Sequence, residues 1–441
     1  MARLRKGGIY LLCLLISAGC NTRKMNAGSY EGSVKTGNYP EKQLPPPHAT
    51  GSAKNFSQVI GWQGTEKPVA PDGFTVSKFA EGLSHPRWIY VGDNGDVFVA
   101  ESNTILKGIK KFGAKISRKI KTQHIGSSEN KIILLRYGNR DGIPEEHYLF
   151  ADNLNQPFGM LILGNHFYVA NTDALLEFDY HTGDTALKGP GKKILTYPGA
   201  GRHWTRNIIT NDEKNKIYIA VGSSSNVAED GIEKETSRAN ILVVNTDGSN
   251  EKIYASGLRN PCGMAWAPGT RTLWTAVNER DELGDELVPD YFTHVTEGGF
   301  YGWPYSYYGQ HEDPRMKDHQ RPDLVSKAIV PDVPIGSHTA SLGLLFYTDK
   351  SFPSRYQNGA FITQHGSWNR SVISGYKVIF IPFRNGKPSG APEDFLTGFT
   401  DNLEKSTVHG RPVGIALLND GSMLVSDDSS NTIWRVKADQ K

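Results

Sequence analysis

The sequence predicts an all-β fold, a six-bladed β-propeller over residues 71–441. Three observations favour it. Short runs of β-branched and aromatic residues alternate with turns rich in Gly, Asp and Asn. A unit of two such runs recurs six times along the chain. One further apolar run, "FTVSKFA", precedes the first copy. Proteins with this architecture have many unrelated functions, so the fold alone does not identify the function, and particular residues must indicate it.

Residues 1–20 are predicted to be a lipoprotein-type signal peptide. "MARLRKGG" is positively charged, and "IYLLCLLI" is apolar but too short to span a bilayer. "SAGC" then leads small residues into Cys20, as in a bacterial lipobox, although Ser17 stands where that motif usually has Leu. The alternative is an ordinary secretory signal. We expect an exported envelope lipoprotein, anchored by lipid on Cys20 at the periplasmic face or the outer membrane.

Residues 21–70 are predicted to form a flexible tether, because they are rich in Gly, Ser, Asn and Pro and poor in large apolar residues. Beyond the leader and Cys20, only Cys262 remains of the three cysteines. The mature chain therefore cannot form an intramolecular disulfide, and its stability must come from packing or bound ions.

The six copies begin near residues 86, 157, 206, 261, 340 and 412. Their spacing of roughly 50 to 80 residues suits one four-stranded blade per copy, with the remaining length in loops. A β-sandwich would rarely repeat one paired-strand unit six times, and a β-helix would have a much shorter period. "FTVSKFA" is expected to close the ring against the last blade.

The charge balance excludes one class of partner. The formal net charge is only +3, and Lys and Arg form no stripe interleaved with aromatic residues. We therefore expect no nucleic-acid partner.

Unusual polar residues gather at the starts of the copies, where the loops of a propeller converge. His203 lies between two arginines in "GRHWTRNIIT". It could take part in catalysis, or it could have the structural role of capping a strand. Several arginines directed at one channel would suit a polyanionic ligand. The candidate residues are Gln156, His203, Arg206, Arg259, Asn260, His338, Asn369, Arg370, His409 and Arg411.

Seven motifs together resemble a known family. They are "GRHWTR", "ASGLRNPCGMAW", "NERDELGDEL", "GGFYGWPY", "GSHTASLGL", "QHGSWNRS" and "HGRPVGI". The chain resembles, from about residue 70 to its C-terminus, the sorbosone dehydrogenase branch of the soluble sugar dehydrogenases that depend on pyrroloquinoline quinone (PQQ). The resemblance implies a six-bladed propeller that oxidises a sugar or a related aldehyde or alcohol, with PQQ and calcium as cofactors and a separate, unidentified electron acceptor.

The resemblance also implies roles for the candidates. His203 would be the base that removes the proton of the substrate hydroxyl while hydride moves to the quinone. Neighbouring cations would keep its imidazole neutral. The cofactor would be bound by Gln156, Arg206, Arg259, Asn260, His338, Asn369, Arg370, His409 and Arg411.

For calcium, the resemblance points to the loop "NERDELGDEL". Asp281 and Glu282 are expected ligands there, since hard oxygen donors suit Ca²⁺. Glu286 and the backbone of Tyr301 resemble a second, structural calcium position of the family. Acidic residues in such a loop could equally be solvated turn formers.

Two other functions stay open from the residues themselves. One is a calcium-dependent lactonase-like hydrolase, which would need clustered acids on several blades. The other is a glycan-binding propeller without turnover, for which the eight tryptophans could provide stacking surfaces. The set of arginines favours the dehydrogenase, because neither a neutral lactone nor a neutral glycan requires it.

Overall fold

The computed structural model describes residues 44–105, 122, 125–137, 142–199 and 201–439. The predicted leader, Cys20 and residues 21–43 lie outside this part. Its regular structure is almost entirely strand, which confirms the all-β prediction. The helices of the described part are three 3₁₀ helices, η3 (Ile232–Glu235), η4 (Pro314–His319) and η5 (Ser354–Tyr356), and the short α2 (Pro322–Val325). In this part of the chain no helix has the length and apolar character needed to cross a bilayer.

The described residues form six four-stranded antiparallel sheets, and each predicted copy supplies the first two strands of one sheet. The first three sheets are β3 (Pro86–Val91), β4 (Val97–Glu101), β7 (Lys131–Arg136) and β8 (Glu146–Ala151); β9 (Met160–Leu163), β10 (His166–Ala170), β11 (Ala174–Asp179) and β12 (Lys192–Thr196); and β13 (Ile208–Thr210), β14 (Lys216–Val221), β15 (Asn240–Asn245) and β16 (Lys252–Ser256).

The next two sheets are β17 (Asn260–Trp266), β18 (Leu273–Asn278), β19 (Pro289–Val295) and β22 (Val333–Ser337); and β23 (Ser341–Phe346), β24 (Ala360–Gln364), β25 (Lys377–Ile381) and β28 (Glu393–Leu396). The sixth sheet joins both ends of the domain, with β31 (Pro412–Leu417), β32 (Met423–Asp427), β33 (Thr432–Ala438) and β2 (Phe74–Ala80).

Burial follows the position of a strand within its sheet. Every residue of the second strands β4, β24 and β32 is buried, whereas the outer strands β8 and β12 consist mainly of exposed and partly buried residues. A strand buried on both faces requires an apolar layer on each side. The sheets therefore pack face to face.

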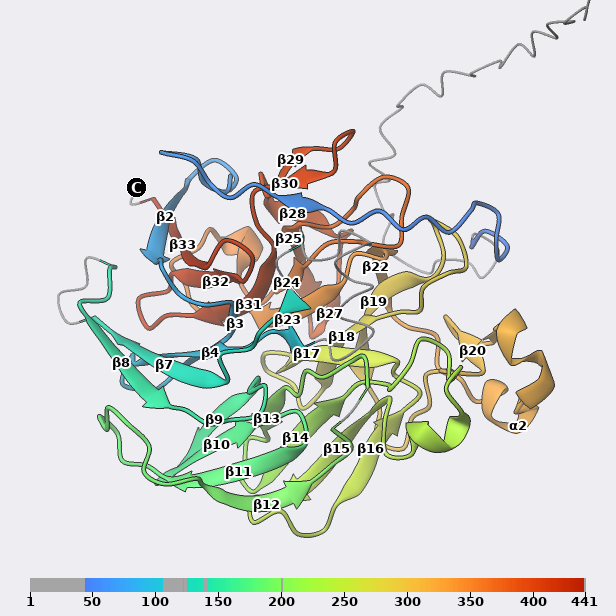
Figure 1. The fold of residues 1–441 in the computed structure, drawn as a ribbon, viewed down its shortest axis with the longest axis horizontal. Coiled ribbons are helices and arrows are strands. Elements are labelled where there is room, and N and C mark those ends of the chain that lie inside the picture. Colours follow the sequence, from blue (N-terminus) through green and yellow to red (C-terminus); the bar gives the residue numbers. More distant parts are fainter. Residues whose placement is uncertain (1–43, 106–121, 123–124, 138–141, 200, 440–441) are drawn as a thin grey trace, which may run out of the picture. The chain divides into compact units, whose positions relative to one another are not determined.

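The packing runs in cyclic order. Phe98 and Phe167 belong to an apolar cluster shared by the first and second sheets, and clusters of the same kind join each later pair. Val99 and Leu424 share a cluster that joins the first sheet to the sixth. The first strands touch in the same order: β3 with β9, β9 with β13, β13 with β17, β17 with β23, β23 with β31, and β31 with β3. In Figure 1, β8, β12 and β16 lie towards the rim of this arrangement.

The early strand closes the sixth sheet, as predicted. β2 pairs antiparallel with β33, with Val76 opposite Val436. The inward residues Val76 and Phe79 are buried, while Thr75 and Ser77 face solvent. Strands from the two ends of the domain thus share one set of backbone hydrogen bonds.

Small two- and three-residue strands complete the fold. β1 (Gln58–Val59), β29 (Thr400–Asn402) and β30 (Thr407–Val408) form one sheet, and the others are the pairs β5 (Thr104–Ile105) with β6 (Ile125–Gly126), β20 (Ser306–Tyr307) with β21 (His311–Glu312), and β26 (Phe383–Arg384) with β27 (Lys387–Pro388).

The second half of the expected tether packs against the sheets. Phe56 stacks on Trp368 at 5.7 Å, and Trp62 stacks on His409 at 4.7 Å. β1 also pairs with β30. For residues 44–70 the expectation of a free linker is therefore corrected: two aromatic rings in an otherwise polar segment hold it in place. Residues 21–43 lie outside the described part.

The closure by β2 contributes to stability. Val76→Ala removes two methyl groups from a buried site, so we expect the free energy of unfolding to fall by about 2 kcal/mol. Ser77→Ala, on the exposed face of the same strand, should change it by less than about 0.5 kcal/mol. Urea unfolding of the mature domain measures both, and equal effects would contradict a packed β2.

Candidate functional site

Polar side chains from three consecutive sheets meet near the start of β17. His203 lies between β12 and β13, Ser223 and Asn226 follow β14, and Arg259 and Asn260 open β17. Asp281 follows β18 and His338 follows β22. We call this group the His203 cluster: His203, Ser223, Asn226, Arg259, Asn260, Asp281 and His338.

The hydrogen bonds of His203 fix its tautomer. Its Nδ1 lies 2.9 Å from both the carbonyl oxygen and the hydroxyl of Ser223. That hydroxyl donates its own hydrogen to the carbonyl of Ser225, at 2.7 Å. Both partners of Nδ1 therefore accept, so Nδ1 carries the hydrogen and Nε2 carries the lone pair. The ring is half-buried, and Nε2 is the nitrogen able to accept a proton.

The surroundings of His203 favour the neutral ring. Burial, together with the charge of Arg259, holds the pKa of His203 well below its usual value. Gly222 allows this crowding: a Cβ there would lie 2.2 Å from Asn260 Oδ1 and 2.6 Å from His203 Cβ. Asn260 Oδ1 is buried and has no hydrogen-bond partner among the described residues. The side chain beside the base therefore keeps an unused acceptor.

Arg259 ties the cluster together. Its Nε and Nη2 donate to the backbone and side-chain oxygens of Asn226, and its Nη1 donates to the carbonyl of Glu279 at 2.6 Å. Nη2 also lies 3.4 Å from Asp281 Oδ2. Each nitrogen of this guanidinium thus meets a protein acceptor. Arg259 fixes the loop after β18 and supplies positive charge near His203.

His338 has the opposite environment to His203. Its Nδ1 lies 3.1 Å from Asp281 Oδ1, and its Nε2 lies 2.8 Å from the carbonyl oxygen of Gly284. Burial alone would lower its pKa, but the hydrogen bond and charge of Asp281 raise it. Burial likewise opposes ionisation of Asp281, yet His338 and Arg259 hold its pKa below the usual value. The two groups form a buried ion pair.

Arg206 holds the backbone of the segment that carries His203. It is fully buried and donates to the carbonyl oxygens of His203, Thr205 and Pro198, at 2.8 to 2.9 Å. Burial lowers its pKa to about 10. The sequence predicted a cofactor-binding residue here, whereas in the structure the side chain is engaged in holding the segment that carries the base.

Asn369 and Arg370 contact the loop after β18. Asn369 Oδ1 accepts from the backbone N–H of Glu282 at 2.7 Å, and its Nδ2 donates to the carbonyl of Ala53 at 2.8 Å. Arg370 donates to the carbonyl of Asp285 at 2.9 Å and pairs with the carboxylate of Glu286. These two residues join the N-terminal segment to the loop, and their polar groups are engaged there.

Gln156 and His409 make hydrogen bonds to residues outside the His203 cluster. Gln156 Nε2 donates to the carbonyl of Asn103 at 2.8 Å. His409 stacks on Trp62, and its Nδ1 lies 2.9 Å from the carbonyl oxygen of Gly61. The contacts of His409 serve to hold residues 61 and 62.

Arg411 belongs to a second buried group that the sequence reasoning missed. Its Nε and Nη2 donate to the carbonyls of His365 and Gly366, at 2.8 and 2.9 Å. His365 Nε2 lies 2.9 Å from Asp428 Oδ1, and Arg87 Nη1 pairs with Asp428 Oδ2. We call Arg87, His365, Arg411 and Asp428 the Arg87 cluster. Arg87 opens the first copy in "HPRW", so its place at a copy start was the signal that could have identified it.

The acidic side chains expected to bind calcium are either paired with cations or exposed. Asp281 is paired with His338 and Arg259, and Glu286 with Arg370, while the side chain of Glu282 is exposed. Tyr301 packs between the third and fourth sheets, and its hydroxyl donates to the carbonyl of His294 at 2.6 Å. Within the described ranges, no three His, Cys, Asp or Glu side chains are gathered as a metal ion would require.

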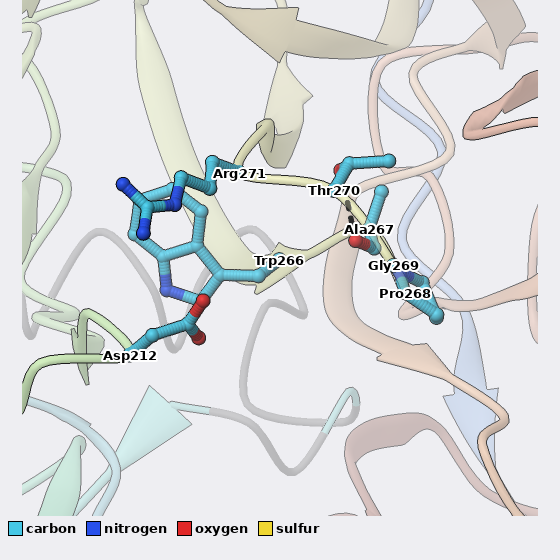
Figure 2. A pocket seen from close by; sticks show the side chains of 7 residues that line it. All are labelled: Asp212, Trp266, Ala267, Pro268, Gly269, Thr270 and Arg271. Atoms are coloured by element: carbon cyan, nitrogen blue, oxygen red, sulfur yellow. Dashed lines mark hydrogen bonds between the residues drawn. The ribbon is translucent and has the colours of Figure 1, made fainter.

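A surface hollow lies at the far end of the β17–β18 hairpin from this site. It measures about 500 Å³ and is lined by Asp212 and residues 266–271, as Figure 2 shows. Asn260 pairs with Asn278 at one end of the hairpin, and Trp266 pairs with Leu273 at the other. About six residues at roughly 3.3 Å each separate the two ends, so the hollow is not part of the His203 cluster.

Comparison with known proteins gives a family and a fold. The TrAA12-like family matches residues 68–292 and 311–439. An uncharacterised protein of Borreliella burgdorferi is 28% identical over 380 residues, which cover 83% of this chain and 89% of that one. The PQQ-dependent pyranose dehydrogenase of Coprinopsis cinerea is 22% identical over 428 residues, which cover 83% of this chain and 54% of that protein.

Two solved structures share the fold. The Trichoderma reesei enzyme of carbohydrate-active enzyme family AA12 superposes with a TM-score of 0.69 at 18% identity, covering 87% of this chain and all of that one. The holo PQQ domain of the Coprinopsis pyranose dehydrogenase gives 0.67 at 19%, with 87% and 100% coverage. These comparisons support the wider resemblance to PQQ-dependent sugar dehydrogenases, and the sorbosone branch stays a prediction.

The contrast between His203 and His338 can be measured by NMR. Because its pKa is lowered, we expect the His203 imidazole to keep neutral chemical shifts from pH 7.5 down to about pH 5.5, below the usual histidine midpoint. His338, whose pKa is raised, should stay protonated to higher pH than a free histidine. Difference spectra of His203→Gln and His338→Gln assign the signals. A midpoint of about 6.5 for His203 would contradict the structure.

Proposed function

Because the chain belongs to the TrAA12-like family, we propose that it is a PQQ-dependent dehydrogenase that oxidises a sugar or a related alcohol or aldehyde. The observation that carries the proposal is the state of His203. Its imidazole is held neutral, with the hydrogen on Nδ1 and the lone pair on Nε2, beside a buried cation. A dehydrogenase that removes a hydroxyl proton needs a base in this form near neutral pH.

The residues present fit PQQ, a planar quinone that carries three carboxylates. Asn260 Oδ1 and Arg87 Nε are buried polar atoms without a partner in the described part of the chain. Gly222 keeps the space between His203 and Asn260 free of a Cβ. Asn260 would contact the cofactor, with the charge of Arg259 behind it. When bound, PQQ supplies the acceptor of the hydride from the substrate carbon.

The protein's own groups supply the rest. His203 Nε2 takes the proton of the substrate hydroxyl as the C–H bond breaks and the carbonyl forms, so the substrate loses one hydride and one proton. The Ser223 carbonyl stabilises the Nδ1–H of the ring that accepts the proton. Arg206 holds the backbone of His203, which keeps the base in place. We propose no calcium step, because Asp281 and Glu286 are paired with cations and Glu282 is exposed.

We also infer that the six sheets are the six predicted blades of a propeller. The support is their cyclic packing, in which the sixth sheet shares an apolar cluster with the first. In that arrangement the copy starts that carry Arg87, His203, Arg259 and Arg411 face one central channel. Sorbosone-type specificity remains a separate proposal, supported by the quoted motifs alone.

The central test is equilibrium dialysis of PQQ against the purified mature domain, followed by turnover of an aldose panel with an artificial acceptor, with and without added Ca²⁺. We expect His203→Ala to retain PQQ but to lose roughly 10²- to 10⁴-fold in turnover. His181→Ala, at an exposed turn, is the matched control and should keep full activity. Absence of PQQ binding, or unchanged turnover of His203→Ala, would overturn the proposal and favour a hydrolase or a glycan-binding protein.

We propose further that the protein is exported and anchored by lipid on Cys20. The support is the "SAGC" end of the leader. In a bacterial host, Cys20→Ser should abolish incorporation of labelled palmitate and release the protein from the membrane fraction, whereas Cys13→Ser should change neither. Labelling that survives in Cys20→Ser would contradict the anchor.

A further inference from the structure

Arg87 is a buried cation at the start of the first sheet. It is the second residue of β3, and its exposed fraction is only 5%. One of its nitrogens, Nη1, pairs with Asp428 and lies 3.4 Å from His365 Nε2. A guanidinium out of water needs an acceptor for each N–H, so the other two nitrogens also require acceptors.

Those two nitrogens form an unused edge. Nε is buried and has no partner within the described residues, and the structure gives Nη2 no partner there either. Nε–H and one Nη2–H lie in the guanidinium plane and point in the same direction, along one edge of the group. This is the edge that binds a carboxylate through two parallel hydrogen bonds. By contrast, each nitrogen of Arg259 meets a protein acceptor.

The carboxylate that pairs with Arg87, that of Asp428, also has other partners. Asp428 is shared, since His365 Nε2 lies 2.9 Å and the Ser429 hydroxyl 3.0 Å from its Oδ1. The second guanidinium, Arg411, donates to carbonyl oxygens. Asp427 accepts from the Trp62 indole and the Arg411 backbone N–H. Arg87 therefore shares Asp428 with His365 and Ser429, and an incoming carboxylate would give its other edge an acceptor.

Arg87 also lies close to the base. Its guanidinium carbon is 5.4 Å from the centre of the Trp204 ring, and Trp204 directly follows His203 in the chain. The indole N–H of Trp204 is fixed at 2.8 Å by the Thr104 hydroxyl. Arg87 therefore contacts the residue that follows His203 in the chain.

We propose that Arg87 is a carboxylate-binding residue, whose Nε–Nη2 edge receives one carboxylate of the ligand in the channel. The inference rests on the proposed function for the source of that carboxylate. It belongs either to PQQ or to a sugar acid, which forms when a substrate aldehyde adds water and the resulting hydrate loses one hydride and one proton. Both offer the same planar, bidentate acceptor.

The test is equilibrium dialysis of PQQ and of D-gluconate, separately, against the mature domain. Arg87→Gln should raise the dissociation constant of the bound carboxylate by about 10- to 100-fold. Arg87→Lys keeps a charge to pair with Asp428 but lacks the two-donor edge, so it should fold normally and still bind at least about 5-fold more weakly. Arg355→Gln, an exposed arginine paired with Glu393, is the control and should change neither constant.

The outcomes separate the two proposals. If the Arg87 variants bind PQQ more weakly, Arg87 binds a carboxylate of the cofactor. If they bind gluconate more weakly but PQQ normally, Arg87 binds the carboxylate of the product. Unchanged binding of both ligands in folded Arg87→Lys overturns the role of Arg87 and leaves the dehydrogenase intact. If the wild-type protein binds no PQQ, the proposed function fails, and the gluconate arm alone decides for or against Arg87.

Discussion

The site depends on one constraint: a guanidinium removed from water must find an acceptor for each of its N–H groups. Arg206, Arg259 and Arg411 lie at copy starts, and backbone carbonyls supply many of their acceptors. Carbonyls of connecting segments are free because these segments do not belong to a ladder. Each buried arginine therefore fixes a loop, and the loops carry the polar residues of the site.

Burial and the neighbouring charges set the protonation of the two histidines. Burial, and then the charge of Arg259, lower the pKa of His203, whose Nδ1 has only neutral acceptors. His338 faces the carboxylate of Asp281, so its proton is stabilised. Asp281 contacts both Arg259 and His338, whereas the Nδ1 of His203 contacts Ser223. Their opposite protonation follows from which of them meets the carboxylate.

The strand pattern could be predicted from the sequence, because period and turn residues are local properties. Each copy start lies within three residues of a first strand, and "FTVSKFA" pairs with the last strand. The direction of the polar side chains could not be predicted. Asn369 and Arg370 are engaged with the loop after β18 through contacts more than 80 residues apart, and the packing of residues 44–70 rests on Phe56 and Trp62 meeting distant rings.

Counting arginines at the copy starts was therefore a sound guide to the place of the site and a poor guide to its ligands. An arginine whose donors all meet protein oxygens has little left for a ligand, and displacing a carbonyl would leave that carbonyl unsatisfied. An arginine with a free edge gains a partner when a ligand arrives. By this criterion Arg259 is part of the support and Arg87 is part of the binding surface, although the sequence suggested only the first. A single unpaired donor is not sufficient, since the buried Nε of Arg206 also has no partner among the described residues; Arg87 differs in having two adjacent donors without one.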